Sequence, residues 1–152
     1  MTHENEMELI FESRSINEGF ARVAVAAFLT QLNPTLEEVS DVKTAVSEAV
    51  TNAIIHGYEQ GVAQICIRCR YEGQDFYIEV EDYGKGISDI EKAMEPLFTT
   101  KPDLERSGMG FSFMEAFMDE LEVESIPARE GTLVRMKKKI GKGRELWSTQ
   151  SL

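Results

Sequence analysis

The sequence contains no apolar run long enough to span a membrane, although 42% of its 152 residues are hydrophobic. Its first ten residues, MTHENEMELI, lack the apolar core of a signal peptide. We therefore expect a cytoplasmic protein with no membrane partner. A chain of this length, with 28% charged residues, is typical of one globular domain with a substantial core.

Basic residues are scarce. The chain has 16 Lys and Arg against 27 Asp and Glu, which gives a net charge of −11 at pH 7. Contacts with nucleic acid phosphates need Lys and Arg on the surface. The excess of acidic residues therefore disfavours direct binding to nucleic acid and favours a protein partner that carries a basic patch.

Cysteine occurs only twice, at Cys66 and Cys69. Both lie in a stretch whose alternating pattern predicts a strand, and strand residues three apart point to opposite faces. A shared metal ion or a disulfide between them is therefore disfavoured, and we expect two reduced thiols.

The chain is organised around one predicted helix, from Thr35 to Gly57. Thr35 and Glu38 have the spacing of a capping box, which satisfies free N–H groups at a helix start. The apolar residues of the segment recur with the spacing of one buried helical face. They are Leu36, Val39, Val42, Val46, Ala49, Val50, Ala53 and Ile54.

A polar row runs along the margin of that apolar face. Glu48, Asn52 and His56 follow one another at intervals of one helical turn. A carboxylate and an amide placed in this way can hold a metal ion or orient a water molecule between them. Taken alone, the same row also fits a solvated helix face, so its meaning depends on the rest of the chain.

Alternation of polar and apolar residues predicts five strands, and helical spacing predicts further helices. The element order predicts a single α+β domain over residues 1–140, a two-layer sandwich in which helices cover one face of a mixed, mostly antiparallel sheet. A polar tail, 141–152, is expected to be disordered. The strands are Met7–Glu12, Gln64–Tyr71, Phe76–Glu81, Glu120–Ile126 and Thr132–Lys139, and the helices are Ser15–Leu32, Ser88–Met94 and Phe111–Phe117. The apolar face expected for the first helix consists of Phe20, Val23, Ala24, Ala27, Phe28 and Leu32.

Three predicted loops contain sequence patterns that are compatible with ligand binding. Asp82 to Gly86 (DYGKG) has two glycines that allow the backbone to approach a flat or charged ligand. Pro96 to Arg106 is a loop without periodicity, which is uncommon in a compact domain unless it is functional. Ser107 to Phe111 (SGMGF) opens a helix, where free N–H groups and the helix dipole favour a phosphate. Each pattern alone is also compatible with an ordinary turn, loop or helix entry.

The order of these signals resembles the Bergerat-fold ATP-binding domain of the GHKL superfamily, which includes gyrase, Hsp90, histidine kinases and MutL. The longer segments SEAVTNAIIHGYE, PLFTTKP, LERSGMGF and FARV resemble the sporulation anti-sigma factors of that superfamily, and the likeness covers about residues 7–140. The resemblance implies a cytoplasmic, homodimeric protein that binds ATP or ADP with Mg²⁺. It implies two protein partners, a sigma factor of the sigma F type that is kept from RNA polymerase and an anti-anti-sigma factor that is phosphorylated on a serine.

The resemblance also implies roles for the matching positions on the helices and strands. Asn52 would coordinate Mg²⁺, and Glu48 would be the general base that accepts the proton of the substrate serine. Asp82 would accept a hydrogen bond from the adenine amino group, with support from Thr132. Arg22 would contact protein partners.

The loops receive implied roles as well. Gly84 and Gly86 would let the adenine lie against their turn, and Arg106 would offset charge at the γ-phosphate. Tyr83 is a bulky residue on that tight turn, and Lys85 adds a positive charge near it. The lid over the phosphates would comprise Thr99, Thr100 and Lys101, and the phosphate cradle Ser107, Gly108, Met109, Gly110 and Phe111.

Three other functions remain open at this level. A non-catalytic, nucleotide-dependent sigma-binding module would need no base at position 48. The detached catalytic domain of a histidine kinase would need a phosphoacceptor histidine on a dimerisation helix, and neither His3 nor His56 suits that role. A general-stress anti-sigma serine kinase would use the same chemistry on a different partner.

Overall fold

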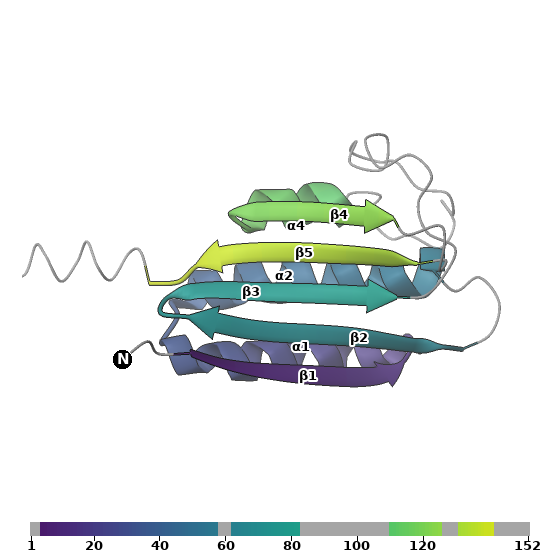
Figure 1. Cartoon of the computed structure of the whole chain (residues 1–152), viewed down its shortest axis with the longest axis horizontal. Coiled ribbons are helices and arrows are strands. Elements are labelled where there is room, and N and C mark those ends of the chain that lie inside the picture. The colour runs from purple at the N-terminus through teal and green to yellow at the C-terminus, as the bar shows by residue number, and fades with distance from the viewer. Residues whose placement is uncertain (1–3, 58–61, 83–109, 126–130, 142–152) are drawn as a thin grey trace, which may run out of the picture.

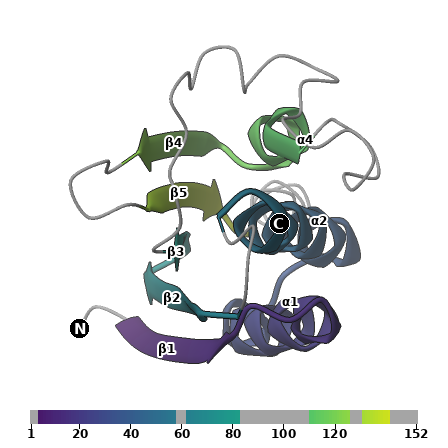
Figure 2. The ribbon, with the colours of Figure 1, turned by 90° about the vertical axis from the view of Figure 1, so that its right-hand side faces the viewer.

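The computed structural model describes residues 4–57, 62–82, 110–125 and 131–141. They form one five-stranded sheet, ordered β1-β2-β3-β5-β4, with helices on one of its faces (Figures 1 and 2). The strands are β1 (Glu4–Glu12), β2 (Gln64–Glu72), β3 (Asp75–Asp82), β4 (Glu120–Ser125) and β5 (Thr132–Lys139). The helical segments are α1 (Ile16–Leu29), η1 (Thr30–Leu32), α2 (Leu36–Asn52), η2 (Ala53–Gly57) and α4 (Gly110–Phe117).

The predicted α+β sandwich is confirmed, and all four strand pairings of this sheet are antiparallel. The helix predicted over Ser88–Met94 and the tail 142–152 lie outside the described residues. The domain boundary near residue 140 therefore stays a prediction. Within the described part of the chain, no helix combines the length and the apolar character needed to cross a bilayer.

The core lies between the sheet and the helices. Ile67 on β2 and Ile78 on β3 are fully buried on the helix-covered face. Strand alternation puts Cys69 on that same face, where it is 1% exposed, and Cys66 on the opposite face. Both thiols are free, as the strand prediction requires.

The start of α2 is fixed by the predicted capping box. The Glu38 backbone N–H donates to Thr35 Oγ1 at 3.1 Å, and the Thr35 N–H donates to Glu38 Oε1 at 2.8 Å. The predicted apolar face is largely buried, with Val42, Val46 and Val50 at its centre. Leu36 is an exception, because it is the first residue of the helix and remains 90% exposed.

The apolar face predicted for the first helix is confirmed at Phe28 and Leu32, which are buried, and is wrong at Phe20 and Val23. The buried residues are Ala21, Val25, Phe28 and Leu29, whereas Phe20 is 55% and Val23 57% exposed. The helix has apolar residues on most of its circumference, so periodicity alone does not select the buried side. Packing against α2 and the rest of the core does, and it buries the small side chain of Ala21 completely.

Candidate nucleotide and partner site

Two polar residues meet at one end of the sheet. Asp82 ends β3 and Thr132 begins β5, and the two stand directly opposite each other in the strand pairing. Both are almost buried, at 5% and 6% exposure. Burial of a carboxylate and a hydroxyl is costly unless they take part in hydrogen bonds. The arrangement therefore suits a polar contact with a ligand or within a polar network.

Asn52 reaches the same end of the sheet from the helical layer. It is the last residue of α2 and is 9% exposed. The chain continues as the π-helical turn η2, which contacts β3. Figure 1 shows the end of α2, the end of β3 and the beginning of β5 on the right-hand side of the sheet. Short π-helical segments are frequent at functional sites.

Phe111 belongs to the first turn of α4, which packs beside α2. Its side chain is 7% exposed and joins the core cluster. This burial anchors the helix entry at which the sequence predicts a phosphate cradle. Gly110 is the first residue of the same helix.

Glu48 and Arg22 meet in a separate recess between α1 and α2, which we call the helix groove. It has a volume of about 420 Å³. The residues that line it are Arg22, Leu36, Val39, Ser40, Lys43, Thr44, Ser47 and Glu48. Asn52, Asp82 and Thr132 are not among them. The structure thus divides the predicted site residues into a sheet-end group and a groove group.

Most of the predicted loop residues lie outside the described residues, so their roles stay predictions. They are Gly84, Gly86, Thr99, Thr100, Lys101, Arg106, Ser107, Gly108 and Met109, together with Tyr83 and Lys85.

The sequence prediction did not include several residues of the helix groove. Ser40, Lys43, Thr44 and Ser47 line it from α2. They follow one another at helical spacing beside the apolar stripe, and that polar row is the signal from which they could have been found. The row was overlooked because polar residues on an exposed helix side are usually only solvated.

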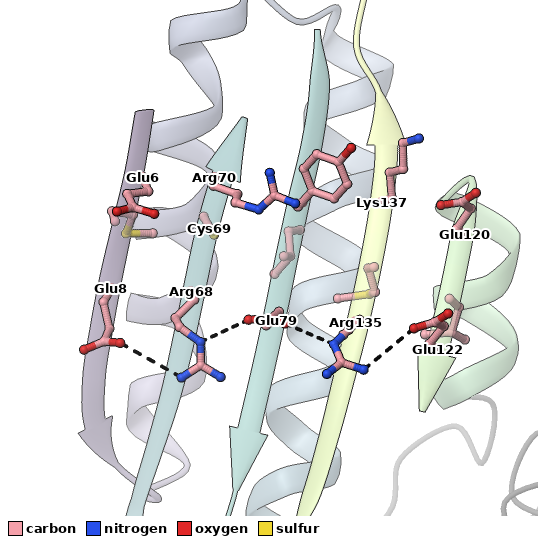
Figure 3. A pocket seen from close by; sticks show the side chains of 15 residues that line it. Glu6, Glu8, Arg68, Cys69, Arg70, Glu79, Glu120, Glu122, Arg135 and Lys137 are labelled. Atoms are coloured by element: carbon pink, nitrogen blue, oxygen red, sulfur yellow. Dashed lines mark hydrogen bonds and ion pairs between the residues drawn. The ribbon is translucent and has the colours of Figure 1, made fainter. Parts of the chain in front are cut away.

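A larger hollow than the helix groove lies on the face of the sheet that carries no helix. It has a volume of about 1190 Å³ and contains none of the predicted site residues. Figure 3 shows a row of alternating charges across all five strands. Glu8 lies 4.0 Å from Arg68, Arg68 3.0 Å from Glu79, Glu79 3.1 Å from Arg135, and Arg135 3.7 Å from Glu122. These charges are paired with one another, and the described site residues predicted from the sequence lie instead at the sheet end, at the start of α4 and in the helix groove.

Hydrogen bonds shift the pKa of Glu79, at the centre of this charged row. Burial by itself would raise the pKa of the Glu79 carboxyl group. The guanidinium groups of Arg68 and Arg135 outweigh burial and hold that pKa below its ordinary value. The pKa of Arg68 is raised first by its hydrogen bond to Glu81 and then by that to Glu79, and the pKa of Arg135 is raised by its hydrogen bond to Glu79.

Comparison with known proteins assigns the family. A model of the "Histidine kinase-like ATPase domain" matches residues 11–138. Proteins named "Anti-sigma F factor" are similar over nearly the whole chain. The relative from Thermoanaerobacter sp. (strain X514) is 62% identical over 93% of this chain and 98% of its own length. The relative from Caldanaerobacter subterraneus subsp. tengcongensis is 60% identical over 95% of this chain and all of its own length.

The chain belongs to the anti-sigma F factor family. A third member, from Clostridium botulinum (strain Eklund 17B / Type B), is 63% identical over 90% of this chain and 96% of its own length. The resemblance inferred from the sequence motifs is thereby confirmed. For this anti-sigma F factor family member, the range matched by the ATPase domain model includes every site residue predicted from the sequence.

Proposed function

We propose that this protein is an anti-sigma factor and an ATP-dependent protein serine kinase. In this proposal it binds a sigma factor of the sigma F type, blocks its association with RNA polymerase, and phosphorylates a serine of an anti-anti-sigma factor to control sporulation transcription. The observation that carries the proposal is that two predicted site residues on α2 face two different parts of the molecule. This helix presents Glu48 to the helix groove and Asn52, one turn later, to the end of the sheet.

ATP or ADP would bind at the sheet end. Asp82 would accept a hydrogen bond from the adenine amino group, and the adjacent Thr132 hydroxyl would support that contact. Gly84 and Gly86 would let the base lie against the backbone. Asp82 and Thr132 are almost buried, so a hydrogen bond from either side chain to the base would be shielded from water.

The described residues fit a magnesium ion that is held mainly through the nucleotide. Mg²⁺ prefers oxygen ligands and usually keeps several waters alongside one or two protein groups and the substrate phosphates. Among the described residues no cluster of three or more His, Cys, Asp or Glu side chains could hold a metal ion by itself. The side-chain oxygen of Asn52 would be the protein ligand, and the bound ion would neutralise charge on the phosphates.

Phosphoryl transfer would take place between the two groups of residues. It depends on positioning and on charge stabilisation more than on covalent help from the protein. Glu48 would accept the proton of the substrate serine as its oxygen attacks the γ-phosphate and ADP departs. Arg106 would offset the charge that develops there. The lid (Thr99 to Lys101) and the cradle (Ser107 to Phe111) would enclose the phosphates.

Protein partners would dock on α1. Arg22 lies at the helix groove, and α1 also has three largely exposed apolar residues: Ile16 at 83%, Phe20 at 55% and Val23 at 57%. Exposed apolar side chains on one helix are typical of a surface that binds another protein. The sigma factor and its antagonist would both use this surface.

A second copy of the chain would dock on the sheet surface that begins with β1. This face carries no helix and has a hollow of about 1190 Å³ that a second copy of the chain would cover by a symmetric contact. Sedimentation at micromolar protein should therefore show a dimer. A monomer under these conditions would contradict the homodimer.

The kinase is tested by mixing the purified protein, Mg²⁺ and γ-labelled ATP with the anti-anti-sigma factor. The partner is supplied either with its target serine or with alanine in that position. We expect label only on the serine form. Absence of label, with nucleotide still bound, would instead identify a non-catalytic sigma-binding module.

A further inference from the structure

Glu18 connects the two helices that form the helix groove. It lies on α1, and its Oε1 accepts a hydrogen bond from the Ser47 hydroxyl on α2. The same oxygen lies 3.9 Å from Nη1 of Arg22, one turn further along α1. The Glu18 side chain is 23% exposed, compared with 41% for Arg22. One half-buried carboxylate therefore contacts both the predicted partner-binding arginine and the residue that precedes Glu48.

Arg22 needs such a contact to keep its position. Its Nε is buried and has no hydrogen-bond partner among the described residues. A buried N–H without a partner is unfavourable, so the guanidinium group would gain by turning towards water. Glu18 opposes this movement, because Ser47 fixes the carboxylate to which Arg22 is attracted.

We propose that Glu18 is a positioning residue that fixes the Arg22 guanidinium group relative to the Glu48 carboxylate. This inference rests on the proposed function, in which Arg22 contacts the substrate protein and Glu48 accepts the serine proton. In this inference Glu18 acts through Arg22 and not on the nucleotide. It thereby fixes the position of the docked substrate relative to Glu48, because a substrate held by Arg22 reaches the base only when Arg22 is held in place.

The test is a double-mutant cycle between Glu18 and Arg22. Glu18→Gln keeps the shape and an acceptor for Ser47 but removes the charge that attracts Arg22. We expect kcat for serine phosphorylation to fall about tenfold, with the affinity for ATP unchanged. In the Arg22→Ala background the same substitution should change kcat less than about twofold, because no guanidinium group remains to be positioned.

A second variant and a matched control complete the experiment. Ser47→Ala leaves the charge of Glu18 but removes its anchor, and we expect a smaller loss of kcat that also disappears in the Arg22→Ala background. Glu12→Gln removes an exposed ion pair of 2.8 Å with Arg14 at the entrance to α1 and should transfer phosphate at the unmodified rate. Melting temperatures measured alongside show whether each variant is folded.

The outcomes separate the inference from the function on which it rests. If the unmodified protein transfers no phosphate, the proposed kinase fails. If it does transfer phosphate and Glu18→Gln lowers kcat by the same factor with and without Arg22, Glu18 has only a general structural role and the inference is overturned. An unchanged kcat in folded Glu18→Gln overturns it as well.

Discussion

Glu48 and Asn52 lie one turn apart on α2, yet of these two residues only Glu48 lines the groove between α1 and α2. Asn52 is instead almost buried where the helix ends, beside the end of the sheet. A single rigid helix thus fixes the distance between a surface suited to a protein partner and a site suited to a nucleotide. Under the proposed function, this relationship would let a small domain transfer a phosphate to a partner that it also binds.

Removal of the Asp82 side chain should weaken nucleotide binding. Asp82→Ala deletes the proposed acceptor for the adenine amino group, and we expect the ADP affinity to fall at least about tenfold in titration calorimetry. Thr132→Val keeps the shape of its side chain without the hydroxyl and should cause a smaller loss. An unchanged ADP affinity in a folded Asp82→Ala variant would refute the adenine site.

The charged row on the open sheet should make stability depend on pH. The pKa of Glu79 is lower in the folded protein than in the unfolded chain, so its charged form stabilises the fold above the unfolded pKa. That contribution is lost as the pH falls through the folded pKa. Urea unfolding should show Glu79→Gln less stable than the unmodified protein at pH 7, and the gap should close towards pH 3. A gap that stays constant with pH would contradict this role.

The two thiols should react slowly in the folded protein. Burial raises the pKa of Cys69 to about 12 and also raises the pKa of Cys66. Because the thiolate is the reactive form, a thiol reagent at pH 8 should label the native protein far more slowly than the urea-unfolded chain. Equal rates for Cys69 in the two states would show that the helix-covered face of the sheet is open to solvent.

The capping box should contribute measurably to stability. Thr35→Ala removes the acceptor for the Glu38 N–H, and we expect the free energy of unfolding to drop by about 1 kcal/mol in urea titrations. Glu38→Ala should cost more, because Glu38 Oε2 also accepts a hydrogen bond of 2.8 Å from the backbone N–H of Gly141. Glu37→Gln in the same first turn serves as the control. Equal losses of stability for all three variants would contradict a specific stabilising role of the capping box.

The sequence predicts the elements better than their contacts. The capping box at Thr35 and the strand pattern around Cys69 depend on neighbouring residues, so they are visible in the chain itself. The buried side of α1 depends on what packs against it, and the prediction therefore placed Phe20 in the core although it is largely exposed. The hydrogen bond from Ser47 to Glu18 joins residues 29 positions apart on two helices, and periodicity carries no information about such a pair.

The central claim is that Glu48 is the base of a protein kinase, and Glu48→Gln tests it most directly. The variant keeps the size of the side chain but cannot accept the serine proton. With ATP in excess and its binding verified, we expect transfer to the anti-anti-sigma factor to slow by about a hundredfold or more. Transfer at the unmodified rate would contradict the account, because the carboxylate would then play no part in the reaction.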